Sequence, residues 1–133
     1  MDRGAAPCVA RLQAMNIHPD TGTILVVDDE ASIVNVLCML LEDEGFTAIG
    51  ETDPVGAVRA IRQHRPCLLL TDIMMPGMSG YELAALAERI DPDLRVVFTS
   101  AVVDRGRRGR PFIAKPFDLA EVMDVVNDEL RAS

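Results

Sequence analysis

The sequence predicts an α/β fold, a doubly wound sheet of five parallel strands with helices on both faces. Short apolar runs alternate with longer segments of helical periodicity along the 133 residues. The longest runs, ILVV, CLLL and VVF, contain no polar residue, which is typical of strands buried on both faces of a parallel sheet. The length fits one domain, with residues 1–22 as an N-terminal tail and residues 23–133 as the folded unit.

Five segments have the length and apolar content of strands, and turn-forming residues separate them from the helical patterns. The expected strands are Thr23–Val27, Thr47–Glu51, Cys67–Thr71, Leu94–Ser100 and Pro111–Ala114. Parallel neighbours require crossover connections, and right-handed crossovers place the helices on both faces of the sheet.

Two of the expected helices are delimited by residues that favour helix ends. The first, Glu30–Glu44, is followed by Gly45, which suits the left-handed conformation that terminates many helices. The second begins after Asp53, a good N-cap residue, with Pro54 at the first helical position. There the missing N–H of proline costs nothing, because that donor has no partner within the helix.

Two further helices begin with the spacing of a capping box. Ser79 precedes Glu82 by three residues, and Asp118 precedes Glu121 in the same way. Between the fourth and fifth strands only the ten residues of Ala101–Arg110 are present. A full helical crossover generally needs a dozen or more, so the fourth helix of the fold is expected to be shortened or irregular.

Polar side chains gather at the strand ends, the edge at which a doubly wound sheet binds its ligands. They are Asp28, Asp29, Asp72, Ser100 and Lys115. Lys115 is the only lysine in a chain with twelve arginines, which indicates a site that requires a compact ammonium group. Codon bias with a single chance lysine is the alternative interpretation.

Three carboxylates in one crevice repel one another, so a positive group is needed beside them. Asp28, Asp29 and Asp72 converge if the first and third strands are neighbours, and Mg2+ suits this oxygen-rich set better than Ca2+. Simple capping of helix and strand ends is the alternative for each residue. Asp72 precedes the turn-rich IMMPGMSG and is the candidate nucleophile toward phosphorus, with Ser100 as a candidate donor to a phosphoryl oxygen.

The ordered motifs VVDDE, TDIMMPGMSG, VVFTSA and FIAKPF resemble those of the receiver domain of two-component response regulators. The resemblance covers residues 23–131 and implies a flavodoxin-like (βα)5 fold with strand order 2-1-3-4-5. It also implies that Asp72 is the phosphoacceptor, that Asp28 and Asp29 hold Mg2+ with Asp29 as the direct ligand, and that Lys115 contacts the phosphoryl group.

The same resemblance assigns further roles around the site. The backbone carbonyl of Met74 is a metal ligand, Ser100 is the switch residue, and Phe112 is the aromatic residue that changes rotamer on phosphorylation. An ordinary core phenylalanine is the alternative for Phe112. The apolar side chains of Met74 and Val102 flank the path of water and are expected to slow hydrolysis, and the bond from Lys115 to the following proline is often cis in the family.

The resemblance implies a phosphorelay receiver that takes its phosphoryl group from a histidine kinase or a histidine phosphotransfer protein and then switches a protein–protein interaction surface. Such a domain catalyses only its own phosphorylation and dephosphorylation. A single-domain regulator and a hybrid-kinase-type receiver both remain open. Two alternative functions belong to other classes of protein. One is an Mg2+-dependent phosphatase with an aspartyl nucleophile, which is disfavoured because no DxDx(T/V) motif is present. The other is an interaction module that no longer switches.

The net charge of −8 disfavours a nucleic-acid partner, and the arginine cluster Arg105–Arg110 is interpreted as a solvated loop. No apolar run is long enough to span a bilayer, and the first residues do not resemble a secretory signal, so a cytoplasmic location without membrane contact is expected.

The first helix is apolar around more of its circumference than a surface helix requires, over Ile33–Glu42. We therefore expect some of the four residues Val34, Cys38, Met39 and Leu41 to face outward. This surface is a candidate docking site for a helical partner or for a second copy of the chain.

Overall fold

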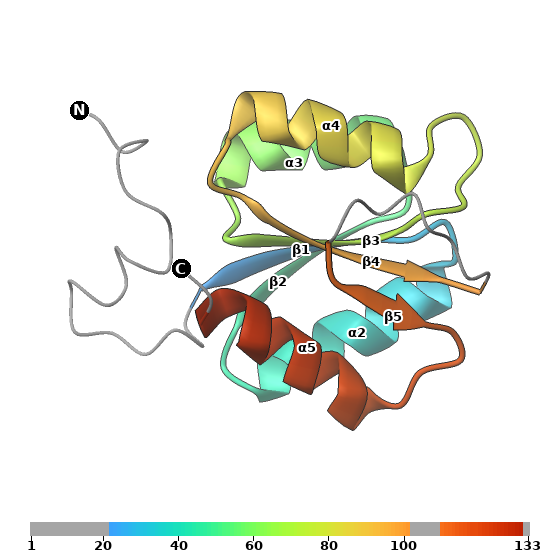
Figure 1. The fold of residues 1–133 in the computed structure, drawn as a ribbon, viewed down its shortest axis with the longest axis vertical. Coiled ribbons are helices and arrows are strands. Elements are labelled where there is room, and N and C mark those ends of the chain that lie inside the picture. The colour runs from blue at the N-terminus through green and yellow to red at the C-terminus, as the bar shows by residue number, and fades with distance from the viewer. Residues whose placement is uncertain (1–21, 102–109, 132–133) are drawn as a thin grey trace.

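The computed structural model describes residues 22–101 and 110–131 as one parallel sheet between two layers of helices (Figure 1). The strand order is β2-β1-β3-β4-β5, as expected. The strands are β1 (Thr23–Val27), β2 (Thr47–Glu51), β3 (Leu68–Asp72), β4 (Arg95–Ser100) and β5 (Phe112–Ala114). The helices of the described ranges are α2 (Ala31–Asp43), α3 (Pro54–His64), α4 (Gly80–Ile90) and α5 (Leu119–Arg131).

Strands β1 and β2 have the predicted bounds. Strands β4 and β5 begin one residue later than predicted, and β3 is displaced by one residue at both ends. The difference at β3 is informative, because this strand runs on to include Asp72. Asp72 is in register with Thr99 of β4, and the next amide, that of Ile73, still donates to the carbonyl of Thr99 at 2.9 Å. The candidate nucleophile is therefore part of the sheet rather than of the loop that follows.

The expected helix caps are present. Gly45 after α2 has a φ of 101°, and the side chain of Asp53 accepts a hydrogen bond from the Val55 amide at the start of α3. Ser79 and Glu82 form a complete capping box at α4. At α5 a carboxylate oxygen of Asp118 accepts from the Glu121 amide at 2.7 Å, so aspartate replaces serine as the cap.

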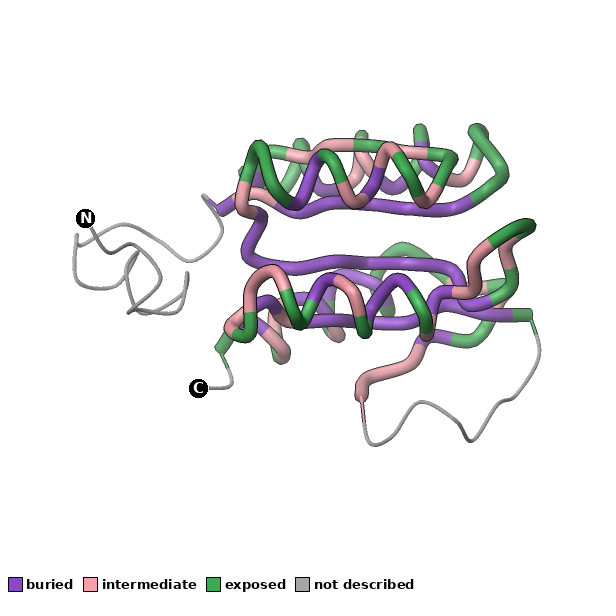
Figure 2. Tube along the Cα trace, turned by 90° about the horizontal axis from the view of Figure 1, so that it is seen from above, coloured by how far each residue is buried: buried purple, intermediate pink, exposed green. Residues whose placement is uncertain are grey.

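Helices α2 and α5 cover one face of the sheet, and α3 and α4 cover the other (Figure 1). Val26 of β1 belongs to a buried cluster with Leu37 of α2 and Val126 of α5. Its neighbour Leu25 belongs to a second cluster with Leu83 of α4. The central strands β1, β3 and β4 are buried between the two layers, while the helices expose their outer faces (Figure 2). Alternate residues of each strand thus point to opposite helical layers.

The expectation that some of the four candidate side chains on α2 face outward is confirmed, but two of the four are buried. Val34 is 5% exposed and Leu41 is not exposed at all, because they lie with Leu37 on the stripe that packs against the sheet. Met39 is 65% exposed, as expected, and Val36 is 47% exposed although it was not among the expected residues. Cys38 is a half-buried free thiol.

The connection between β4 and β5 is described only at its ends, because residues 102–109 lie outside the described ranges. The expectations of a shortened helix, of an apolar flank at Val102 and of a solvated arginine cluster concern that segment. The expected tail, residues 1–22, likewise lies outside the described ranges except for its last residue. Among the helices of the described ranges, none is long and apolar enough to cross a membrane.

Candidate phosphoacceptor and metal site

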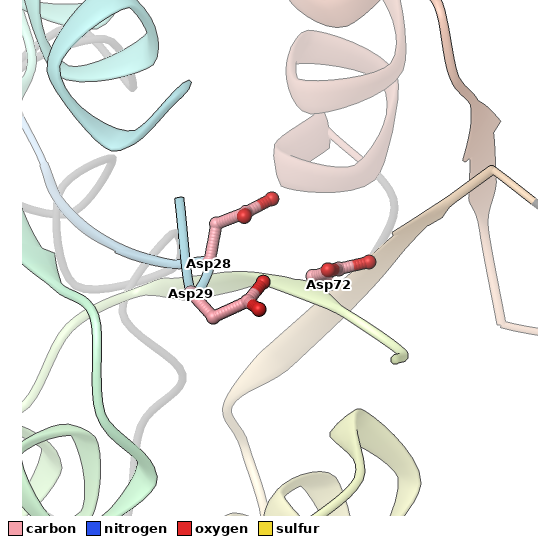
Figure 3. Close-up of side chains that lie close together, drawn as sticks. All are labelled: Asp28, Asp29 and Asp72. Carbon is pink, nitrogen blue, oxygen red and sulfur yellow. The ribbon is translucent and has the colours of Figure 1, made fainter. Parts of the chain in front are cut away.

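Three carboxyl groups meet where β1 and β3 end (Figure 3). Asp28 and Asp29 directly follow β1, and Asp72 is the last residue of β3. These strands are parallel neighbours with Val27 opposite Thr71, so the residues after this pair leave the sheet at the same level. One carboxylate oxygen from each aspartate lies within 4.8 Å of the others. Strand adjacency therefore brings together side chains that are far apart in the sequence.

The burial of the three carboxyl groups differs. Asp28 is 1% exposed and Asp72 is 5% exposed, whereas Asp29 is exposed to solvent. Val26 and Leu70 both pack toward α2 and α5, so Asp28 and Asp72, two residues further along their strands, point to the same side. The cluster is open toward solvent at Asp29 and closed at the other two residues.

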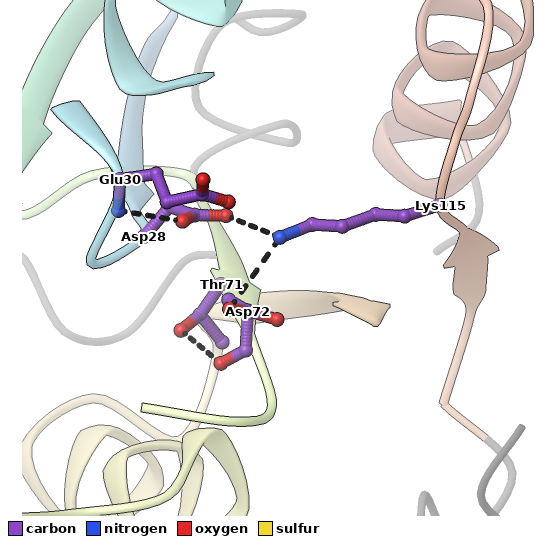
Figure 4. A network of polar contacts seen from close by, with 5 residues as sticks. All are labelled: Asp28, Glu30, Thr71, Asp72 and Lys115. Atoms are coloured by element: carbon purple, nitrogen blue, oxygen red, sulfur yellow. Dashed lines mark hydrogen bonds and ion pairs between the residues drawn. The ribbon is translucent and has the colours of Figure 1, made fainter. Parts of the chain in front are cut away.

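Lys115 supplies the positive charge expected at this edge (Figure 4). Its Nζ atom donates a hydrogen bond of 2.8 Å to Oδ2 of Asp28 and lies 3.5 Å from Oδ2 of Asp72. The residue directly follows β5, and its amide donates to the carbonyl of Ser100 at 2.8 Å. The bond from Lys115 to Pro116 is cis. The only lysine of the sequence thus reaches the carboxylate cluster from the end of β5, which β4 separates from β3.

Burial and charge act in opposite directions on the acid–base behaviour of the site. Burial, reinforced by the negative charge of Asp28, raises the pKa of Asp72, although Lys115 and the backbone near Met74 partly offset this rise. Burial alone lowers the pKa of Lys115, but the hydrogen bond and charge of Asp28, together with Asp72, outweigh it and raise that pKa overall. Lys115 is therefore held as an ammonium ion.

The donor set fits a hard divalent cation. Three carboxyl groups face one ammonium, so negative charge remains uncompensated in a partly buried pocket. All three offer oxygen ligands, and no sulfur or imidazole belongs to the cluster that the described residues form. Mg2+ is commonly held by one or two carboxylates together with water and phosphate oxygens. The residues present fit that ion.

The other expected site residues lie around this cluster. Ser100 ends β4 and is 1% exposed, and Phe112 begins β5 and packs partly buried against the layer of α3 and α4. Met74 lies two residues beyond Asp72 and is 63% exposed. The structure thus brings Asp28, Asp29, Asp72 and Lys115 together. The switch roles of Ser100 and Phe112 and the metal-binding role of the Met74 carbonyl stay predictions.

Three supporting residues were not singled out from the sequence. The amide of Glu30 donates to Oδ1 of Asp28 at 2.9 Å, which leaves Oδ2 for Lys115. The hydroxyl of Thr71 donates to the backbone carbonyl of Asp72 at 3.0 Å. Gly80, at the start of α4, packs against the same carbonyl. Only Gly80 carried a signal, as the last residue of the motif TDIMMPGMSG, since a glycine at a helix start is unusual without a steric reason.

Comparison with known proteins places this geometry in context. Residues 24–127 match the response regulator receiver domain. The DNA-binding response regulator MtrA of Mycobacterium tuberculosis is 35% identical over 115 residues, covering 81% of this chain and 50% of MtrA. The chain therefore spans about half the length of the curated relatives it matches.

Solved structures give the same result. The receiver domain of the hybrid histidine kinase CckA matches with a TM-score of 0.74 and 28% identity, over 83% of this chain and 100% of that domain. CheY of Borrelia burgdorferi, solved in complex with CheX, BeF3 and Mg2+, matches with a TM-score of 0.73 and 28% identity, over 80% of this chain and 87% of the other.

Proposed function

The chain belongs to the response regulator receiver domain family, and from this premise we propose that Asp72 accepts a phosphoryl group from a phosphohistidine in an Mg2+-dependent reaction. The observation that carries the proposal is the meeting of three carboxyl groups with the only lysine of the chain at one sheet edge. CheY of Borrelia burgdorferi, a similar protein, was solved with BeF3 and Mg2+, which supports the same chemistry here.

In the proposed transfer a carboxylate oxygen of Asp72 attacks phosphorus. The new O–P bond forms as the P–N bond of the phosphohistidine breaks, and the imidazole leaves with the electron pair of that bond. Lys115 lies 3.5 Å from Asp72, so its ammonium is positioned to attract an oxygen of the incoming phosphoryl group. The raised pKa of Lys115 keeps that charge in place throughout the neutral range.

Asp28, Asp29 and Asp72, with the backbone carbonyl of Met74, would hold the metal ion. When bound, Mg2+ neutralises charge on the carboxylates and on the phosphoryl oxygens. Burial of Asp28 and Asp72 excludes bulk water from two of the three carboxyl groups, which strengthens every charge interaction in the site.

The proposal extends to signalling. Ser100 and Phe112 act as the switch, because one ends β4 beside β3 and the other begins the edge strand that leads to Lys115. The domain catalyses only its own phosphorylation and dephosphorylation. Its donor is a histidine kinase or a histidine phosphotransfer protein, and the docking surface or self-association surface is the exposed face of α2, formed by Val36 and Met39.

MtrA is named as a DNA-binding protein, and this chain matches only half of its length. We infer no nucleic-acid contact for residues 1–133 themselves, because their net charge of −8 repels phosphate backbones. The activity of any longer protein that contains this domain would depend on parts beyond it.

The direct test is incubation with acetyl phosphate and Mg2+ followed by intact-protein and peptide mass spectrometry. We expect a single phosphoryl adduct, located on Asp72 and absent without Mg2+. Asp72→Ala should remove the adduct, and Asp124→Asn, a change at an exposed carboxyl group on α5, should retain it. Turnover of small phosphate esters would favour the phosphatase alternative, and absence of any adduct would favour an interaction module that does not switch.

A further inference from the structure

The peptide that joins Asp72 to Ile73 is enclosed on two sides by residues with no role in the proposed transfer. On one side the Thr71 hydroxyl donates to the Asp72 carbonyl at 3.0 Å, and Thr71 is completely buried. On the other side lies Gly80, also buried, whose amide donates to the Ile73 carbonyl at 2.8 Å. The loop that follows the phosphoacceptor therefore returns to the point from which it started.

Gly80 lies so close to this peptide that no side chain fits there. A Cβ atom added at residue 80 would lie 2.3 Å from the Asp72 carbonyl oxygen, 2.9 Å from the Ile73 Cα and 3.0 Å from the Asp72 carbonyl carbon. All three are backbone atoms, so no change of rotamer relieves the contact. Any larger residue must displace either the start of α4 or the Asp72–Ile73 peptide.

The start of α4 is held against the sheet by its own neighbours. The Tyr81 ring packs edge-on against Phe98 of β4 with ring centroids 5.0 Å apart, and Leu83 is completely buried. The capping box of Ser79 and Glu82 fixes the helix end at the same place. A side chain at residue 80 would therefore shift the Asp72 side of the contact as well as the helix.

We propose that Gly80 and Thr71 are positioning residues that hold the Asp72–Ile73 peptide and thereby set the place of the Asp72 carboxylate and of the Met74 carbonyl. The inference rests on the proposed role of Asp72 as phosphoacceptor. Asp72 meets Lys115 only at 3.5 Å and shares a cluster in which the carboxylate oxygens lie within 4.8 Å, so a shift of about 1 Å alters every distance in the site.

The test compares two glycines in the first turn of a helix. A Cβ at Gly80 meets backbone, whereas a Cβ at Gly56 of α3 meets only the carboxylate end of the flexible Glu51 side chain. Gly80→Ala is expected to slow phosphorylation of Asp72 by acetyl phosphate by about tenfold or more. Gly56→Ala should leave that rate unchanged.

Loss of stability alone must not explain the effect. Val126→Ala removes a buried side chain of α5 away from the site and provides a variant of lowered Tm with the wild-type rate. A second readout needs no activity: in metal-free protein, the backbone amide resonances of Asp72 and Ile73 should shift in Gly80→Ala and stay in place in Gly56→Ala.

Thr71→Val keeps the shape of the buried side chain and removes only its hydroxyl, so it provides an independent test if Gly80→Ala does not fold. It should also slow phosphorylation and shift the Asp72 amide. Wild-type rates in both variants, or an equal loss in Val126→Ala, would overturn the inference. An unphosphorylated wild-type protein would instead overturn the proposed function, so the two failures are distinguishable.

Discussion

Lys115 donates a 2.8 Å hydrogen bond to the buried carboxylate of Asp28, 87 residues away in the sequence, and lies 3.5 Å from Asp72. The ammonium is thus closer to a candidate metal ligand than to the candidate phosphoacceptor. A divalent cation held at this oxygen of Asp28 would compete with Lys115 for its negative charge, because two positive charges so close together repel each other. The resting site is held together by this pair.

Lys115→Met tests that competition. Asp28 would remain buried with only the Glu30 amide as donor, and we expect the metal-free variant to lose about 3 kcal/mol of unfolding free energy. Mg2+ should then restore more stability to the variant than it adds to the wild type. Thermal unfolding with Mg2+ and with a chelator measures this. Arg110→Gln, which breaks an exposed ion pair with Glu88, is the control, and equal Mg2+ stabilisation of all three proteins would contradict the expectation.

Asp72→Asn is expected to stabilise the metal-free protein near neutral pH. Burial and the charge of Asp28 raise the pKa of Asp72 above 3.8, so its contribution to stability is present below that value and is lost as pH rises through the raised pKa. The variant has no such loss. Its Tm should exceed that of the wild type by a few degrees near pH 7, and the difference should shrink as the pH falls below 3.8.

The raised pKa of Lys115 acts in the same direction, but on the alkaline side. Its contribution to stability is complete below its usual pKa of 10.5 and is lost only as pH rises through the higher pKa of the folded protein.

For the Asp72 prediction, a Tm difference between Asp72→Asn and wild type that does not change between acid and neutral pH would show that the Asp72 charge costs the fold nothing.

The exposed thioether of Met74 is expected to prolong the life of the phosphorylated state. Met74 is 63% exposed two residues beyond Asp72 and offers no strong hydrogen-bond partner to an attacking water. Met74→Asn should shorten the half-life of the acyl phosphate by about tenfold, because a polar group can then orient that water. Decay of the phosphoryl adduct measures the effect. Met39→Asn, an equally exposed position on α2, should leave the half-life unchanged.

Gly50→Ala is expected to destabilise the fold without entering the site. A Cβ at this position of β2 would lie 2.4 Å from Cγ1 of Val34 and 3.2 Å from Sγ of Cys38, so the Val34 side chain or the whole of α2 must shift. Overpacking of this kind costs about 1–3 kcal/mol. Urea unfolding measures the loss, with Gly56→Ala as the comparison. A Gly50→Ala variant as stable as the wild type would mean that α2 packs less tightly than these distances indicate.

The exposed and the buried faces of α2 can be tested separately with one residue from each, Met39 and Val34. Met39→Asp should leave stability within about 0.5 kcal/mol of wild type, whereas Val34→Asp should unfold the domain because it places a charge in a site that is 5% exposed. If the exposed face docks a kinase, Met39→Asp slows transfer from a phosphorylated histidine kinase and leaves phosphorylation by acetyl phosphate intact. If it joins two copies, sedimentation equilibrium detects a shift toward monomer. No change in either measurement would remove the proposed surface.

Most of the fold could be predicted because its determinants are local. Uninterrupted apolar runs identified the buried strands, and Gly45, Asp53 and the pair Ser79–Glu82 marked the helix ends. The sequence placed Asp28 and Asp72 at the same sheet edge, because parallel strands present their carboxyl ends there, and their convergence required in addition that β1 and β3 be neighbours. The outward face of α2 could not be predicted in full, since a nearly all-apolar segment does not reveal which stripe packs against the sheet, and Val34 and Leu41 proved to be buried.

By itself, the sequence determined the order of elements, the sheet edge that carries the chemistry and the residue types at that edge, because periodicity and strand-end position are properties of the chain alone. Only the tertiary structure decided that Lys115 pairs first with Asp28 and that Thr71 and Gly80 enclose the Asp72 peptide. These relations depend on distances between backbone segments from different strands and helices. Such distances result from packing of the whole domain, and no local pattern encodes them.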